Sequence, residues 1–291
     1  MELSWTTKLR IAAAAAVGVA LIGVFAWPLT APSEISGEVD FSGVVILLAL
    51  AVVSGFVGFF VSWPYGREIG ILSVPFGLAV WATRSGSMAA LMQLNPSDTA
   101  RLTVLHSLKW QPVLWLAVVA AGFVGPVLCQ RALSKPEPAG SKSDSKPNPA
   151  RYLSPIIAVP AAAFIAYVCI GVFAQDVRLG DKALGFVMAQ PAMGQLGFAV
   201  LMSFGVAAFA VRKLLGVGYV FPAIASLFVT AFAISSYGVN VQYMAHQWPA
   251  AFFSNTAASI LPCQMVAYGV LGSVAGYWMA ARYDHWRKYE M

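Results

Sequence analysis

The stretch GVVILLALAVVSGFVGFFVSW, from Gly43 to Trp63, decides the fold class, because no Asp, Glu, Lys or Arg interrupts it. An α-helix needs about 20 apolar residues to cross the roughly 30 Å of hydrocarbon in a bilayer. A helix that is hydrophobic on all sides must be buried in protein or in lipid. The stretch therefore predicts a transmembrane helix.

The composition of the whole chain agrees with this stretch. Of the 291 residues, 59% are hydrophobic and 10% are charged, against roughly 25% charged in an average soluble domain. Windows without charge recur along the chain and predict eight transmembrane helices, over residues 9–28, 43–63, 70–92, 111–131, 153–175, 193–212, 217–240 and 259–281. The sequence thus predicts an all-α integral membrane protein.

Two of these spans leave an alternative open. In the third span, Arg84 interrupts the apolar run and Pro75 lies near its start, so a re-entrant or kinked helix is the alternative to a continuous one. The first span follows Lys8 and Arg10 and has a cleaved signal peptide as its alternative. No convincing small-x-small cleavage site follows Pro28, and the repeat described below pairs this span with an internal helix, so a retained helix is favoured.

The distribution of Lys and Arg predicts the orientation in the membrane. If the N-terminus is cytoplasmic, most of the Lys and Arg residues fall on the cytoplasmic side. The opposite side then holds only Arg101, Lys109, Arg178 and Lys182, with Arg84 inside or near the third span. We expect both termini in the cytoplasm of a bacterial-type inner or plasma membrane. This asymmetry also accounts for the net charge of +6, so nucleic-acid binding is not indicated.

A repeated motif indicates an internal duplication. The sequence IGVFA occurs at residues 22–26 and again at 170–174, an offset of 148. Matches at an offset of 150 follow in the second and fourth spans, among them Gly55 with Gly205 and Gly122 with Gly272. The third and seventh spans fit worst, and match only at an offset of 152. Three of the four helix pairs therefore support two copies of a four-helix unit.

The even number of spans in each copy fixes how the copies are related. Both copies enter the membrane in the same direction, so they are parallel repeats related by a pseudo-twofold axis along the membrane normal. The predicted organisation is a first repeat at 1–133, a linker at 134–152, and a second repeat at 153–291 with a short basic tail. The linker is rich in Pro, Ser and Lys and is expected to be flexible and cytoplasmic.

Small residues predict where helices approach closely. Gly272 and Gly276 form a GxxxG pattern, which lets two helix backbones pack together in lipid. Packing within the chain is the favoured interpretation, and a dimer face is the alternative.

A polar group in the third and seventh spans is the candidate binding site. Arg84 and Ser85 lie at equivalent depth to Ser236, Tyr237 and Asn240 of the second copy. A charge at membrane depth marks a function by default. The five residues could form a pocket for a neutral or anionic head group. The alternatives are that Arg84 extends to the interface and that the neutral polar groups are the hydrated end of a helix.

The two predicted outer loops differ in character. In the first, Ser97 is a candidate N-cap, and leucines at helical spacing predict a short amphipathic helix. The second carries no formal charge but contains Trp248, Phe252 and Phe253. We expect this loop to rest on lipid, on its own bundle or on another protein.

Several absences bear on function. The sequence has no nucleotide-binding loop, HExxH or GxSxG motif, no carboxylate pair within a span, and no Cys or His cluster, so neither a cofactor nor a metal is predicted. The lack of ionisable groups within the membrane and the apolar outer loop favour a non-catalytic subunit that scaffolds or anchors a membrane assembly, with a membrane-protein partner or a second copy of the chain. A permease or channel for a small neutral, weakly anionic or lipid-like substrate is the alternative, and a lipid-modifying enzyme is the third hypothesis.

Overall fold

The computed structural model describes residues 4–133, 150–181, 185–189, 191–244, 253 and 255–289. Six helical segments in these ranges are long and apolar enough to cross a membrane: 5–25, 41–61, 98–132, 154–173, 193–215 and 220–242. They coincide with six of the predicted spans. The chain is therefore an α-helical membrane protein, as the sequence predicts, and the third and eighth predicted spans are the two outside this set.

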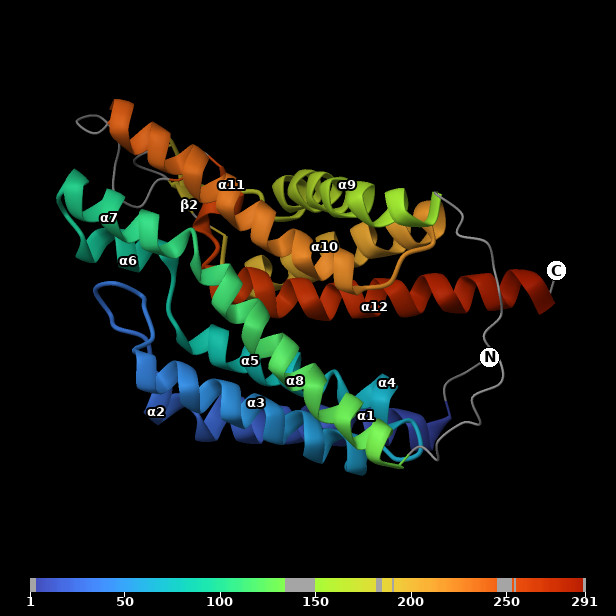
Figure 1. Cartoon of the computed structure of the whole chain (residues 1–291). Coiled ribbons are helices and arrows are strands. Elements are labelled where there is room, and N and C mark those ends of the chain that lie inside the picture. Colours follow the sequence, from blue (N-terminus) through green and yellow to red (C-terminus); the bar gives the residue numbers. More distant parts are fainter. Residues whose placement is uncertain are drawn as a thin grey trace. The chain divides into compact units, whose positions relative to one another are not determined.

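In the described first half of the chain, residues 4–133, every element of secondary structure is a helix (Figure 1). In chain order these are α1 (Trp5–Gly18), the π-helix η1 (Val19–Phe25), α2 (Trp27–Thr30), α3 (Phe41–Val61), α4 (Gly66–Gly70), α5 (Ser73–Arg84), α6 (Met88–Leu94), α7 (Asp98–Leu108) and α8 (Gln111–Leu133). Polar caps set several of their starts. Asp40 accepts from the Gly43 amide at the start of α3, and hydrogen bonds from the Ser42 hydroxyl and this amide lower the pKa of the carboxyl.

The second half adds a hairpin that the sequence did not predict. Its elements are α9 (Ala150–Phe173), β1 (Val177–Asp181), β2 (Gly185–Ala189), α10 (Met193–Leu215), α11 (Val220–Met244), the 3₁₀-helix η2 (Thr256–Ser259) and α12 (Pro262–Tyr289). The two strands are antiparallel, with Val177 opposite Ala189. At the end of α10, Gly216 has a φ of +68°, the left-handed conformation that commonly terminates a helix.

The third predicted span is interrupted. α5 ends at Arg84, and α6 begins at Met88 after Ser87, whose hydroxyl accepts from the Ala90 amide. Between them Gly86 has a φ of +85°, a conformation that glycine adopts without steric cost. The span is therefore two helices, and the expectation of one continuous helix over 70–92 is wrong.

The eighth predicted span is long but lies in a protein environment. α12 has 28 residues, more than a membrane crossing requires. Its first half is almost entirely inside the protein, and Met265, Val266, Ala267 and Val270 are fully buried. A helix covered by its neighbours can carry polar residues such as Gln264 and Ser273 that a lipid-facing helix would not accommodate.

The contacts divide the chain into two compact units. Unit 1 consists of Met1–Ala31, Val39–Trp81 and Leu116–Ile157, and unit 2 of Pro32–Glu38, Ala82–Trp115 and Ala158–Met291. The end of α5, together with α6 and α7, thus packs with the second half of the chain. Residues 134–149 of the predicted linker lie outside the described part, and residues 150–152 begin α9.

Unit 1 is held together by helices that approach at glycines. Along α1 and η1, a Cβ added at Gly18 would overlap the carbonyl of Ser73, and one at Gly23 would lie 2.9 Å from the Cβ of Val80. α3 and α8 also meet closely, because a Cβ at Gly55 would overlap the carbonyl oxygen of Gly122. These approaches bring backbones into van der Waals contact, the main source of helix association in lipid.

Unit 2 has an equivalent approach between α10 and α12. A Cβ added at Gly272 would overlap the carbonyl oxygen of Leu201, and one at Gly276 the carbonyl oxygen of Gly205. Farther along, Lys213 pairs with Asp284, so the two helices run parallel. The GxxxG pattern therefore packs within the chain, and the alternative of a dimer face at these two glycines is wrong.

The repeated IGVFA motif provides a paired prediction. Gly23→Ala is expected to lower the free energy of unfolding by about 1 kcal/mol, because the new methyl group must displace Val80. Gly171→Ala, at the same place in the second motif, has nothing within 4 Å of the added Cβ and should leave stability equal or higher. Unfolding of both variants in mixed micelles measures the difference. Equal losses at the two positions would contradict this account.

Candidate functional site

Arg84 and Ser85 lie at the interruption between α5 and α6. Arg84 is exposed in the last turn of α5, where a cation complements the negative end of the helix dipole. The Ser85 hydroxyl donates to the Ala82 carbonyl at 2.8 Å and forms a hydrogen bond with the Cys263 sulfur at 3.3 Å. Ser85 is thereby placed against the start of α12.

Gln264 connects the same interruption to α12 and was not singled out from the sequence. Its buried side chain donates from Nε2 to the carbonyls of Ala82, at 3.2 Å, and Gly86, at 3.1 Å. Its Oε1 accepts from the Leu261 amide at 3.2 Å. An amide has both donors and an acceptor, so this one side chain satisfies backbone groups on two segments. In the sequence, Gln264 stands out only as a polar side chain in an apolar, charge-free window.

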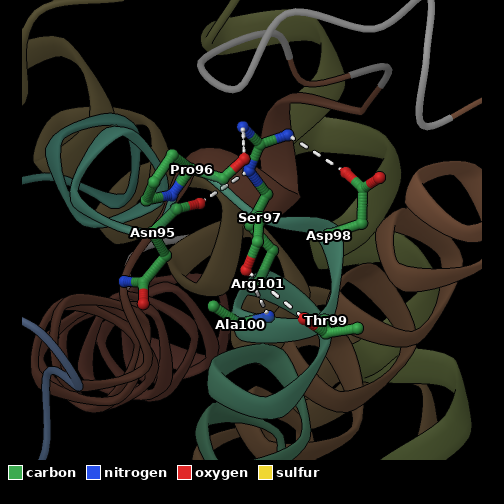
Figure 2. Close-up of polar contacts among 7 residues, drawn as sticks. All are labelled: Asn95, Pro96, Ser97, Asp98, Thr99, Ala100 and Arg101. Atoms are coloured by element: carbon green, nitrogen blue, oxygen red, sulfur yellow. Dashed lines mark hydrogen bonds and ion pairs between the residues drawn. The ribbon is translucent and has the colours of Figure 1, made fainter.

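A second polar cluster lies between α6 and α7, where Ser97 caps α7 as predicted (Figure 2). The Arg101 side chain is only 12% exposed. Its Nε donates to the Asn95 carbonyl at 2.9 Å, its Nη2 donates to the Pro96 carbonyl at 3.1 Å, and its Nη1 lies 3.7 Å from the Asp98 carboxylate. The fixed fork of the guanidinium thus fastens the loop between the two helices.

The same cluster fixes a segment much earlier in the chain. The Asn95 Nδ2 donates to the Ile35 carbonyl at 2.8 Å and to the Leu91 carbonyl at 2.9 Å. Gln111 donates to the Gly37 carbonyl at 3.0 Å. Hydrogen bonds therefore join residues 32–38, α6, α7 and Gln111 into one element, which we call the helical cap. Sequence spacing gave no signal for it, because its bonds join residues far apart in the chain.

Tyr237 of α11 and Phe253 form a buried aromatic pair in unit 2. Their ring centroids are 4.8 Å apart, and the two side chains are 1% and 8% exposed. α7 packs on α11, the helix that carries Tyr237. Of the three surroundings expected for the apolar loop, Phe253 therefore rests on its own bundle.

The remaining candidate residues are only partly placed. Ser236 and Asn240 are half-buried on α11, so they do not lie in a fully lipid-facing position. Convergence of Arg84 and Ser85 with these residues stays a prediction. Trp248 and Phe252 lie outside the described residues.

Arg101→Lys tests how much the helical cap depends on the guanidinium. A lysine keeps the charge but has no planar fork to reach two carbonyls and a carboxylate at once. We expect the free energy of unfolding to fall by about 1 kcal/mol. The matched control is Arg84→Lys, at an exposed arginine in the same unit, where a smaller change is expected. An equal effect at both positions would contradict a special role for Arg101.

The described part of the chain contains no group of three or more His, Cys, Asp or Glu side chains that could hold a metal ion. The side chains with the most polar contacts at this end of unit 2, Arg101, Asn95 and Gln264, bind backbone carbonyls of the protein itself. Their N–H groups already donate hydrogen bonds within the protein. Comparisons of the chain with protein-family models, with curated proteins and with solved structures find no match.

Proposed function

We propose that this chain is a non-catalytic subunit that scaffolds or anchors a larger assembly in the membrane. The observation that carries the proposal is the helical cap. Arg101, Asn95 and Gln111 use their donors on the carbonyls of Asn95, Pro96, Ile35, Leu91 and Gly37. Such bonds give a rigid surface rather than a set of groups free for chemistry. A rigid surface binds a partner at a lower entropic cost than a mobile one.

The architecture that we propose for this subunit is eight crossings in two parallel four-helix repeats, with both termini in the cytoplasm. Glycine contacts support the duplication. Gly55 of α3 approaches Gly122 of α8 in unit 1, and Gly205 of α10 approaches Gly272 of α12 in unit 2. Both members of the second pair lie 150 residues after their counterparts. Two pairs of glycines that match in sequence and also approach each other are stronger support than matches of single glycines, because glycine is common in membrane helices.

The partner in this proposal is another membrane protein or a second copy of the chain, bound beside the helical cap. The neutral loop that carries Trp248 and Phe252 is the proposed contact, since aromatic residues dominate the energetics of protein interfaces. Phe253 itself is buried inside its own unit, with its ring against that of Tyr237 in α11.

Gentle extraction with a photo-crosslinking residue at position 248 tests this proposal. A stoichiometric crosslinked product, a partner or a dimer, is expected after purification from the native membrane. The control carries the same photo-crosslinker at Phe232, a residue 60% exposed on the apolar surface of α11. A crosslink to lipid alone at position 248, with a monomeric native mass, would overturn the assembly hypothesis.

A permease or channel is the second candidate, and one observation favours it. The third predicted span breaks at Ser85–Ser87, and interrupted helices form the substrate sites of many transporters. In that case Arg84 and Ser85, with Ser236, Tyr237 and Asn240, would bind a small neutral or anionic substrate. Arg84→Ala should then abolish flux into vesicles while expression and folding persist. Unchanged flux would remove this assignment of the site.

A further inference from the structure

The start of α1 and the end of α3 lie side by side at one end of unit 1. α1 packs on α3, and a Cβ added at Gly18 or at Gly58 would meet Ser73. The Arg10 guanidinium lies 5.7 Å from the centroid of the Tyr65 ring, which brings the first turns of α1 next to the residues that follow α3. Both helices belong to membrane-spanning segments, so Arg10 and Tyr65 lie near a membrane surface.

Two cations at this end, Lys8 and Arg10, have no carboxylate partner in the described part of the chain. The carboxylates that form ion pairs there are Asp98 and Asp284, and both bind cations of unit 2. Glu68 of α4, which packs on α1, is exposed and forms no ion pair with Lys8 or Arg10. Lys8 is exposed and Arg10 is half-buried. These two cations therefore attract an anion from outside the protein.

The ring of Tyr65 holds Arg10 without using its hydrogen-bond donors. A cation–π contact is an attraction between a cation and the face of a ring. Among the described residues, this ring is the one partner of the Arg10 side chain. A guanidinium carries five N–H donors in a planar fork that matches the oxygens of a phosphate group. Arg10 is therefore positioned in advance for a phosphate, which lowers the entropic cost of binding one.

Exposed aromatic side chains lie at the same level as the two cations. Trp5 is 78% exposed, Trp63 55% and Tyr65 48%. Trp and Tyr are enriched at the head-group level of membrane proteins. Deeper along α3, the exposed rings of Phe56 and Phe60 have centroids 5.0 Å apart and continue this surface toward the hydrocarbon. A molecule that fits both features has an anionic head and an apolar tail.

We propose that the first two turns of α1 and the end of α3 bind the head-group phosphate of an anionic phospholipid of the bilayer. Lys8 and Arg10 contact the phosphate, while Trp63 lies at the level of the glycerol backbone. The acyl chains follow Phe60 and Phe56. This site rests only on the membrane fold and is independent of the proposed scaffolding role.

Titration of the purified full-length protein in neutral detergent tests the site. The probes are phosphatidylglycerol and phosphatidylcholine, and lipid-bound states are counted by native mass spectrometry. Phosphatidylglycerol is expected to bind with higher affinity. Lys8→Gln should weaken its binding roughly fivefold and Lys8→Gln/Arg10→Gln roughly thirty-fold, because each Lys or Arg contributes a similar attraction. Lys8 is exposed near the start of a helix, so the single variant is expected to fold.

Tyr65→Leu separates the positioning of Arg10 from its charge. This variant keeps every charge but removes the ring that holds the guanidinium, and it should weaken binding of phosphatidylglycerol roughly threefold. The matched control is Tyr283→Leu, which removes the ring beside Lys213 in unit 2 and should leave the affinity unchanged. Equal affinities of the two variants would contradict the role of Tyr65 in this site.

A second double variant distinguishes this site from general basicity. Lys109→Gln/Arg287→Gln removes the same charge at two positions of unit 2 and should change affinity by less than about twofold, because salt screens charges outside the site. Inorganic phosphate at about 10 mM should not displace the lipid, because it has no acyl chains to bury. Equal binding of the two lipids, equal losses in the two double variants, or displacement by inorganic phosphate would each overturn the proposal.

Discussion

Replacing Gly276 by alanine is expected to lower the free energy of unfolding by roughly 3 kcal/mol, near the upper end of the usual cost of overpacking. The added Cβ would lie 2.9 Å from the Cα of Gly205 and would overlap its carbonyl oxygen. A flexible side chain could move away from the methyl group, but here the obstacle is the backbone of α10. The two helices must separate, and contacts along their whole shared length weaken.

The matched control for this variant is Gly238→Ala in α11. Gly238 is also a helical glycine of unit 2, but a Cβ added there has nothing within 4 Å. Alanine should stabilise the helix at this position by about 0.5–1 kcal/mol. Reversible unfolding in mixed detergent micelles measures both variants. If Gly276→Ala proved neutral, close packing of α10 on α12 would not be a main source of stability in unit 2.

Much of the membrane fold follows from simple rules of composition. Charge-free windows of about 20 residues locate α3, α9, α10 and α11 because the length of a crossing is set by the bilayer. The start of α7 at Ser97 could also be predicted, since an N-cap is a local hydrogen bond. Features that depend on a few neighbouring residues are thus accessible from sequence.

Features that depend on distant contacts are not accessible in this way. The Asn95 side chain connects two distant segments, because it donates a hydrogen bond to the carbonyl of Ile35, 60 residues away. Gln264 acts on Ala82 and Gly86 across a still longer separation. Spacing along one helix carries no signal for such bonds. Charge along the sequence points to Arg84, but it gives no sign of the hydrogen bonds that Arg101 and the neutral Gln264 make to backbone carbonyls.

The IGVFA motif shows the same limit on identical residues. Its first copy completes the π-helix η1, with Ile22 and Gly23 buried, whereas its second copy spans the end of α9. In the first copy Gly23 lies against Val80 of α5, and in the second no neighbour lies near Gly171. The surroundings, rather than the motif, decide the local structure.

Replacement of Gln264 by methionine is expected to lower the free energy of unfolding by roughly 2 kcal/mol. Methionine has nearly the volume of glutamine and adapts to irregular space, so packing changes little. The hydrogen bonds to Leu261, Ala82 and Gly86 are lost together. The Ala82 carbonyl keeps the Ser85 hydroxyl as a donor, and Gly86 is exposed to other donors. The Leu261 amide, in a buried residue, therefore carries most of the cost.

Hydrogen exchange distinguishes this mechanism from a general loss of stability. If Gln264 holds the interruption between α5 and α6, amides of residues 82–94 should exchange faster in Gln264→Met, while those near Gly205 and Gly272 keep their protection. The control Gln242→Leu removes an exposed glutamine at the end of α11 and should stay within about 0.5 kcal/mol. Uniform acceleration across unit 2 would mean that Gln264 supports the unit as a whole. Selective acceleration would identify its amide as the link between the interruption at Ala82 and Gly86 and the start of α12.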